Sequence, residues 1–188
     1  MVLASQSPRR SELLRTAGFD FIVRARPVEE VLRDAENPSD YVRRLARAKA
    51  EASWERDGEV VLGADTIVVL GDRVLEKPAD ASHARAMLES LSGQTHTVIT
   101  GICLRHAAGE IVDCESTQVH FTKLEPGEIE TYVASGEPMD KAGAYAIQGL
   151  ASKFIDRIEG DYFNVMGLPL ASVYKHLKAL KKYPDRGR

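Results

Sequence analysis

The sequence predicts an α/β fold, and three observations support that prediction. Segments with the apolar period of helices alternate with short runs typical of strands along the 188 residues. The run 60–64, Val-Val-Leu-Gly-Ala, is almost continuously apolar, as expected for a strand buried at the centre of a sheet. Gly71-Asp72 separates two short strand candidates and is a strong hairpin signal.

In the first half of the chain, proline, glycine and capping residues mark where helices begin and end. Pro8 is placed to begin a helix that ends by Gly18, and Ser39 or Asp40 can cap the next one. The expected elements are a strand over 2–4, this first helix, a strand over 19–25, an irregular stretch over 26–38, a helix to about Arg56, the strand 60–64 followed by Asp65 and Thr66, and hairpin strands over 67–70 and 73–75.

The second half continues the alternation. We expect a helix from Asp80 to about Gly93, strands over 94–105 and 110–121, a helix from Pro126 to before Gly136, a loop with short helical turns over 140–149, a strand over 153–158, and a final helix after 167–169. The buried face of that helix is predicted to carry Leu170, Val173, Tyr174, Leu177 and Leu180. The length of 188 residues fits one ordinary domain over 1–188, or a domain with a small lobe, and no repeat or clear linker divides the chain.

Composition excludes several classes of protein. A net charge of −3 argues against a dedicated nucleic-acid binder, and we expect the tail 181–188 to be a solvated end. No apolar run is long enough to span a bilayer, and the N-terminus lacks a signal-peptide pattern. Cys103 and Cys114 are expected as diagonal neighbours in a hairpin, about 7–8 Å apart, and therefore reduced in a cytoplasm. The five histidines lack metal-ligand spacing, so no zinc site is expected.

The first candidate site is the junction between the first strand and the first helix. Ser5 and Ser7 supply hydroxyls, the helix N-terminus supplies backbone N–H groups, and Arg9 and Arg10 supply guanidinium groups. This combination suits an anion, and phosphate best of all. The alternative is a serine-capped amphipathic helix with solvated arginines.

Asp65 is the second candidate, because a carboxylate at the end of a buried strand is unfavourable unless it is paired or used. It can accept a proton from water or hold a divalent cation. The alternative is an acid that caps a turn. An aspartyl-nucleophile phosphotransferase would show a second Asp two residues on, where this chain has Ile67.

Lys49 continues the apolar stripe of its helix, so it either extends along the surface or points into a pocket. Glu76 and Lys77 offer an acid and a base on a rigid corner before Pro78, although exposed charges are ordinary on a turn. In the loop 140–149, Gln148 can pair with a base edge and Tyr145 can pack on a ring, although the small residues of this loop can also mark tight packing.

We expect 161–169 to be a structural helix start, in which Tyr162 and Asn164 are candidates to line a pocket.

Together these segments resemble the Maf family of nucleotide pyrophosphatases. The motifs that carry the resemblance are Leu-Ala-Ser-x-Ser-Pro-Arg-Arg-x-Glu-Leu-Leu at 3–14, Arg-Leu-Ala-x-x-Lys-Ala at 44–50, Gly-Ala-Asp-Thr at 63–66, Glu-Lys-Pro at 76–78, Leu-Ser-Gly-x-Thr-His at 91–96, Asp-Lys-Ala-Gly-Ala-Tyr at 140–145 and Gly-Leu-Pro at 167–169.

The resemblance implies a fold similar to inosine triphosphate pyrophosphatases: a long twisted mixed sheet flanked by helices, with two lobes and a central cleft. It implies hydrolysis of a nucleoside triphosphate to the monophosphate and pyrophosphate with Mg²⁺ or Mn²⁺, and a homodimer.

The resemblance also implies a role for each matching residue. Asp65 stands where the family has its proton acceptor, and Glu30 matches an acid associated with metal, although physical reasoning does not separate it from Glu29. Phosphate-binding positions match Ser5, Ser7, Arg9, Arg10, Lys49 and Lys77. A triphosphate carries about four negative charges, so converging cations and a metal bridge to the carboxylates are required.

Arg9, Thr66 and Gln148 match the branch that acts on dTTP and UTP, because a neutral amide can read a pyrimidine O4 and N3–H together. The branch acting on 7-methyl-GTP is expected to have Trp, Gln and Glu at these positions. Ala146 stands where the branch usually has Gly, and a positive φ there would strain the Gln148 loop. Alternatives are the same chemistry on 7-methyl-GTP or modified nucleotides, or a non-catalytic nucleotide-binding regulator of cell division.

Overall fold

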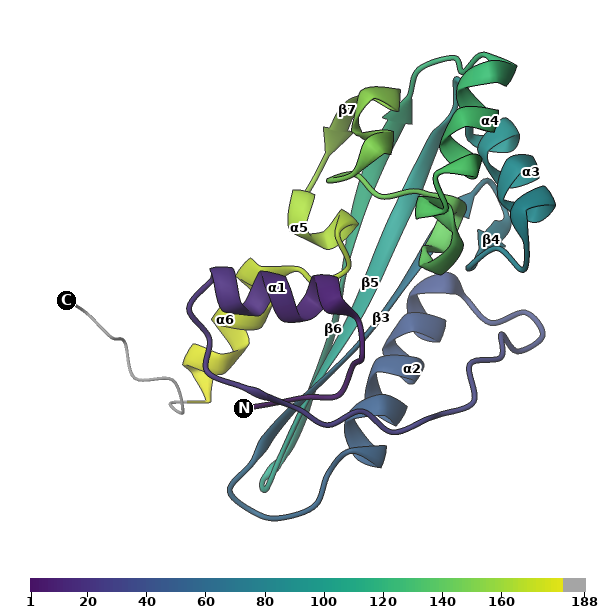
Figure 1. The fold of residues 1–188 in the computed structure, drawn as a ribbon. Coiled ribbons are helices and arrows are strands. Elements are labelled where there is room, and N and C mark those ends of the chain that lie inside the picture. The colour runs from purple at the N-terminus through teal and green to yellow at the C-terminus, as the bar shows by residue number, and fades with distance from the viewer. Residues whose placement is uncertain (181–188) are drawn as a thin grey trace. The chain divides into compact units, whose positions relative to one another are not determined.

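The structure is a computed structural model that describes residues 1–180, so the predicted solvated tail 181–188 lies outside the described residues. The strands are β1 (Val2–Leu3), β2 (Ile22–Val23), β3 (Val60–Leu70), β4 (Arg73–Leu75), β5 (Thr95–His106), β6 (Gly109–Phe121) and β7 (Ile155–Glu159) (Figure 1). The α-helices are α1 (Pro8–Thr16), α2 (Pro38–Ala52), α3 (Ala81–Leu91), α4 (Pro126–Ala134), α5 (Tyr162–Val165) and α6 (Leu170–Ala179). Short 3₁₀ turns cover Glu137–Asp140, Ala142–Ala144 and Leu150–Phe154.

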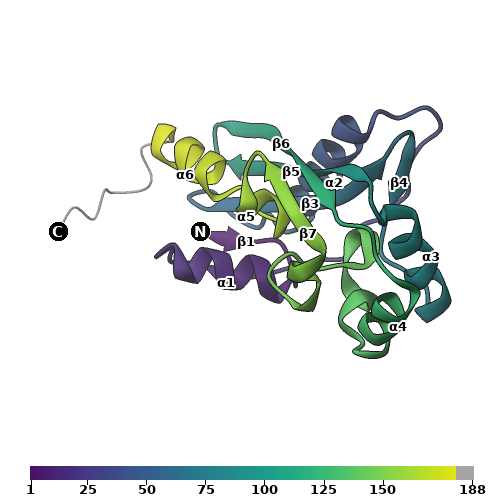
Figure 2. The ribbon, with the colours of Figure 1, turned by 90° about the horizontal axis from the view of Figure 1, so that it is seen from above.

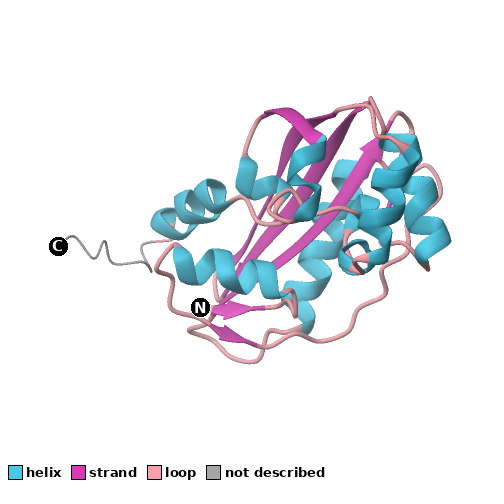
Figure 3. Cartoon of the chain, turned by 45° about the horizontal axis from the view of Figure 1, so that its top comes forward, coloured by secondary structure: helices cyan, strands magenta, loops and turns pink. Residues whose placement is uncertain are grey.

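The strands form one mixed sheet, drawn in magenta in Figure 3. Its order is β2-β1-β3-β5-β6-β7, with β4 paired to β3 beside this path. β1 is parallel to β2 and β3, whereas β4 and β7 are antiparallel to β3 and β6. The predicted α/β class, with a long mixed sheet and flanking helices, is confirmed.

The described chain divides into two compact units. The first contains residues 1–65, 100–115 and 167–180, and Val2, Ala46, Val61 and Cys103 are part of its buried core. The second contains residues 66–99 and 116–166. In that unit α3 and α4 lie side by side over a core that includes Leu88, Tyr132 and Phe154 (Figures 1 and 2). The central cleft implied by the resemblance stays a prediction.

In the first unit, helix α2 lies against the sheet so closely that its backbone meets two glycines. A Cβ atom added at Gly63 would lie 2.1 Å from the Ala46 carbonyl oxygen. One added at Gly101 would lie 2.4 Å from the Val42 carbonyl oxygen. No side chain fits at either position, so both glycines have a packing role.

Several sequence predictions need correction. The strand 60–64 does not stop at Asp65, because β3 runs on through the β-branched residues 66–69 to Leu70. Helix α2 is capped by Asn37, whose side chain accepts from the Ser39 N–H, with Pro38 as the first helical residue. This helix ends at Ala52 instead of Arg56, and the predicted strand 19–25 is reduced to Ile22–Val23.

The final helix differs in its buried face. Val173 and Leu177 are buried as predicted, but Tyr174 is 42% exposed. Cys103 and Cys114 are both free, as expected. No helix within residues 1–180 combines the length and the apolar character needed to cross a membrane.

We predict that Gly101→Ala lowers the free energy of unfolding by about 1–3 kcal/mol, because the new methyl group must push α2 away from the sheet. Gly127→Ala is the matched control, since Gly127 lies in α4 with no atom within 4 Å of an added Cβ and no left-handed φ. That change should be neutral or stabilising by up to about 1 kcal/mol. Urea denaturation followed by circular dichroism measures both; equal stabilities would contradict the close packing.

Candidate functional site

Lys49 lies at the centre of a charged cluster in the first unit. Its Nζ is 2.6 Å from Asp65 Oδ1 and 2.8 Å from Glu30 Oε1. Only 13% of the Lys49 side chain is exposed, whereas 48% of Glu30 is. The Lys49 side chain therefore does not extend along the surface. It points inward from α2, and its ammonium group contacts two carboxylates.

Asp65 is buried in the middle of β3, with 6% of its surface exposed. The strand end that lies near it belongs to β1, whose pairing with β3 stops at Leu62, where the Ala4 N–H donates to the Leu62 carbonyl. Burial raises the pKa of Asp65 above its ordinary value, and the neighbouring Lys49 and Arg10 only partly oppose this shift. A buried carboxylate with a raised pKa is a stronger base than an exposed one.

Arg10 is also buried, although it carries a positive charge. Its Nε donates to the Gly167 carbonyl at 2.8 Å and its Nη1 donates to Ser5 Oγ at 3.1 Å. Ser5 Oγ also accepts from the Ser7 N–H at 3.2 Å. Burial lowers the pKa of Arg10, while Asp65 and Glu30 favour its charged form. The guanidinium group is therefore fixed in orientation by Ser5 on one side and Gly167 on the other.

Ser7 is the N-cap of α1, yet its side chain makes no capping hydrogen bond. Pro8 follows at the first helical position and Arg9 is half-buried beside Arg10. The Ser7 hydroxyl is therefore not engaged as an ordinary serine cap, and binding of an anion at this helix start stays a prediction.

Gly167 is a functional candidate that sequence reasoning missed. It has a φ of 109°, a conformation that favours glycine, and its carbonyl accepts from Arg10. The available signal is the Gly-Leu-Pro motif at 167–169, which carries part of the family resemblance, although the residues themselves predict only a helix start there.

In this cluster the two positive charges of Arg10 and Lys49 are matched by the two negative charges of ionised Asp65 and Glu30. Within residues 1–180, no group of three or more His, Cys, Asp or Glu side chains is arranged to hold a metal ion. Asp65 and Glu30 are two carboxylates that converge on the same lysine. Mg²⁺ is commonly bound by one or two carboxylates together with substrate phosphates, so this donor set fits a metal that arrives with a nucleotide.

The second unit holds the remaining predicted residues. Thr66 is half-buried in β3, and Lys77 and Gln148 are exposed. Two of the motif segments meet here, because the Gly143 N–H donates to the Glu76 carbonyl at 3.1 Å. A Cβ atom at Gly143 would lie 2.8 Å from the Val68 side chain, and its φ is 68°. The loop 140–149 therefore packs against β3 and against the segment after β4 that carries Lys77.

The structure corrects three expectations in this unit. Tyr145 does not face a ligand ring, because it is buried and its hydroxyl lies 2.8 Å from His96 Nε2. Asn164 is fully buried and donates to the Val98 carbonyl and to Thr117 Oγ1, which makes it structural. Ala146 has no positive φ; that conformation falls on Gly143 and Ala144, so the expected strain is absent at Ala146. Tyr162 is 39% exposed.

The sequence-predicted residues thus fall into two groups. One connected set in the first unit contains Ser5, Ser7, Arg9, Arg10, Glu30, Lys49 and Asp65. Thr66, Lys77 and Gln148 belong to the second unit. Glu29, the alternative to Glu30, is exposed, and it is Glu30 that contacts Lys49.

Comparison with known proteins adds a family and close relatives. The profile of the family described as Maf-like protein matches residues 1–180. A Koribacter versatilis protein named dTTP/UTP pyrophosphatase is 51% identical, over 95% of this chain and 93% of its own length. Proteins of the same name from Symbiobacterium thermophilum and Hahella chejuensis are 52% and 47% identical, over 90% and 95% of this chain and 88% and 90% of their own lengths.

A solved structure from Mycobacterium abscessus, titled nucleoside-triphosphatase / dITP/XTP pyrophosphatase, aligns over 97% of both chains. Its sequence identity to this chain is 15% and the TM-score is 0.43.

His96 belongs to one of the quoted motifs, and its surroundings predict a pH effect on stability. It is buried between Phe121 and Tyr145, and its Nδ1 has no hydrogen-bond partner among the described residues. Burial lowers the pKa of His96 to about 4. The unfolded chain takes up this proton near pH 6.5 and the folded chain only near pH 4, so stability should fall as the pH drops through that range.

We expect the loss to be on the order of 3 kcal/mol and to be absent in His96→Gln, which cannot be protonated. Urea unfolding at several pH values between 7 and 4.5 measures it. His83→Gln, at an exposed position in α3, is the control and should keep the pH dependence of the wild type. A His96→Gln profile that follows the wild type would show that another group is responsible.

Proposed function

The chain belongs to the Maf family, and from this premise we propose that it hydrolyses dTTP and UTP to the monophosphate and pyrophosphate. Relatives that carry this name are 47–52% identical over at least 90% of the chain. The observation that carries the proposal is the buried Asp65 beside Lys49 and Arg10, because it joins a base to two cations in one place.

In this proposal Asp65 accepts the proton of the attacking water. A base must be ionised at the working pH and still basic enough to take a proton. Burial makes the Asp65 carboxylate more basic, while Lys49 and Arg10 keep the ionised form accessible. These opposing effects suit a general base better than either effect alone.

Arg10 and Lys49 bind the phosphates, together with Ser7, Arg9 and Lys77. The Arg10 guanidinium group is held by Ser5 and Gly167, so it meets a phosphate without first becoming ordered. Lys49 exchanges part of its contact with two carboxylates for contact with phosphate oxygens. Asp65 and Glu30 would hold a divalent cation, Mg²⁺ or Mn²⁺, which supplies positive charge to the phosphate oxygens when bound.

Arg9, Thr66 and Gln148 are proposed to select the pyrimidine. Gln148 is exposed, and its amide offers a donor and an acceptor to a base. We further propose that the 188-residue chain is a single domain with two lobes, that it pairs as a homodimer and that it works in the cytoplasm. The two free cysteines are compatible with a reducing compartment.

We predict that Asp65→Asn lowers the rate of pyrophosphate release from dTTP by about 10²–10⁴-fold, because a general base is lost, while nucleotide binding persists. Its melting temperature at pH 7.5 should not fall, since burial disfavours the ionised carboxylate that Asn replaces. Asp72→Asn, in an exposed turn, is the control for loss of a carboxylate. Undiminished turnover in Asp65→Asn would remove Asp65 from the role of base.

A panel of dTTP, UTP, CTP, GTP, ITP and 7-methyl-GTP with Mg²⁺ or Mn²⁺ tests the substrate. We expect dTTP and UTP to be turned over fastest, and Gln148→Glu to lose most of that preference, because a carboxylate cannot donate to O4. Gln118→Glu, exposed on β6, controls for the added charge. Preference for 7-methyl-GTP, or bound nucleotide without pyrophosphate release, would contradict the proposal.

A further inference from the structure

The loop that carries Glu30 has almost no apolar burial to hold it in place. We define the Glu30 loop as residues 26–36, which have no helix or strand. Its two large aliphatic residues after Glu30 point to solvent: Val31 is 57% exposed and Leu32 is 40% exposed. Burial of apolar surface is the usual source of loop order, so the position of Glu30 has to come from polar contacts.

Arg44 of helix α2 makes the largest set of such contacts. Its Nε donates to Glu36 Oε1 at 2.6 Å, and its Nη2 donates to Glu36 Oε2 at 2.7 Å. Nη2 also donates to the Val31 carbonyl at 2.9 Å. The Glu36 side chain is only 12% exposed, and hydrogen bonding to Arg44 lowers the pKa of Glu36 to about 2. A bidentate arginine–carboxylate pair of this kind is stronger and more directional than a single contact.

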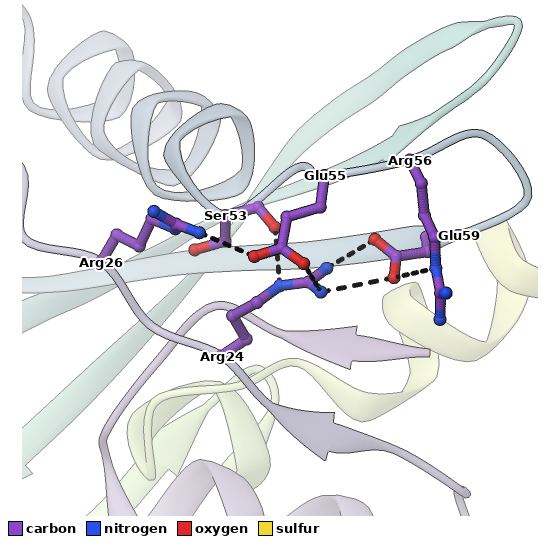
Figure 4. Close-up of polar contacts among 6 residues, drawn as sticks. All are labelled: Arg24, Arg26, Ser53, Glu55, Arg56 and Glu59. Atoms are coloured by element: carbon purple, nitrogen blue, oxygen red, sulfur yellow. Dashed lines mark hydrogen bonds and ion pairs between the residues drawn. The ribbon is translucent and has the colours of Figure 1, made fainter.

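The start of the Glu30 loop is attached in a similar way. Arg26 donates to Glu55 at 2.6 Å, and Glu55 also accepts from Arg24, which in addition contacts Glu59 and the Ser53 carbonyl (Figure 4). Both ends of the loop are therefore held by arginine–glutamate contacts. Glu30 lies between these two attachments.

The contact to Val31 connects Arg44 with Glu30. Glu30 and Val31 are consecutive, and both are held by α2, through Lys49 and Arg44 respectively. The Lys49–Glu30 pair by itself is half-exposed, and pairs of that kind fix a side chain weakly. Moreover, a phosphate that draws Lys49 away would leave Glu30 without this partner.

We propose that Arg44 is a positioning residue that holds the Glu30 loop on α2 through Glu36 and the Val31 carbonyl, and so keeps Glu30 at the Lys49–Asp65 cluster. The catalytic consequence rests on the proposed function, whereas the attachment of the loop does not. Arg44 belongs to the motif at 44–50, in which only Lys49 had been given a role.

Trypsin provides a test that needs no activity, because Arg33 is exposed within the loop. We expect Arg44→Ala to be cleaved after Arg33 at least several times faster than the wild type, with the fragments identified by mass spectrometry. Arg43→Ala is the matched control, since Arg43 is adjacent to Arg44 but pairs with Asp40 of the same helix and not with the loop. Glu36→Gln is the second variant, in case Arg44→Ala folds poorly. Equal cleavage of both loop variants and the wild type would overturn the proposal.

The second test asks whether Arg44 acts through Glu30. Loss of a residue that supports a ligand commonly lowers activity roughly 10–100-fold, which we expect for kcat/KM of Arg44→Ala with dTTP. In a Glu30→Gln background the same change should add no further loss, because the residue it positions has already lost its charge. Losses that multiply in the double variant would mean that Arg44 acts elsewhere, and would overturn the proposal.

The two proposals fail in different ways. A wild type that releases no pyrophosphate would refute the proposed function, and the trypsin result would still decide whether Arg44 holds the loop. A wild type that turns over dTTP, with Arg44→Ala as active and as resistant to trypsin as Arg43→Ala, would refute the positioning role alone.

Discussion

The close contact between helix α2 and the sheet is the constraint on which the charged cluster depends. Gly63 lies under the Ala46 carbonyl, and no larger residue fits between them. Asp65 is two residues after Gly63, so both face the same side of β3, and Lys49 is one helical turn after Ala46. A side chain at Gly63 would move the helix and separate Lys49 from Asp65. Backbone packing therefore sets the length of the central ion pair.

The cluster also shows how buried charged groups are accommodated in the folded chain. Buried charges are unfavourable unless they are paired. Here Lys49 is paired with Asp65 and Glu30, and Arg10 is held by Ser5 and the Gly167 carbonyl. In the proposed function, the phosphates of a nucleotide would replace contacts of Lys49, while the contacts that orient Arg10 would remain. The proposal therefore assigns different behaviour to the two cations: Lys49 changes partners and Arg10 keeps its orientation.

Sequence patterns predicted the class of fold and most elements, because apolar periodicity and the positions of Pro and Gly are local properties. They misplaced the end of β3, since Val68 and Val69 continue a strand whose length depends on pairing with β4. Sequence patterns placed Gly63 only within a motif of the candidate site. Its packing role depends on helix α2, which comes from another part of the chain and contacts Gly63 in the folded protein. The loop around Tyr145 favoured a ligand role for this side chain. Its hydroxyl instead contacts His96, which is 49 residues away and therefore outside any local pattern.

The candidate site was predictable in part for similar reasons. Lys49 and Asp65 break their local apolar patterns, and that makes them visible in a sequence. Glu30 breaks no pattern, because it lies in an irregular polar loop, so only the resemblance to a family pointed to it. Gly167 contributes its backbone carbonyl to Arg10, and Arg44 donates to the backbone carbonyl of Val31. Every residue has a backbone carbonyl, so no residue type in the sequence indicates these contacts.

The bond between Arg10 and Gly167 has a consequence for the order of synthesis. The two residues are 157 positions apart, so the ribosome adds another 157 residues after Arg10 before the acceptor of this arginine exists. Until then a buried guanidinium group lacks one of its partners, a situation that disfavours the compact state. A nascent or truncated chain that ends before Gly167 therefore lacks one of the two contacts that orient the Arg10 guanidinium group in the folded protein.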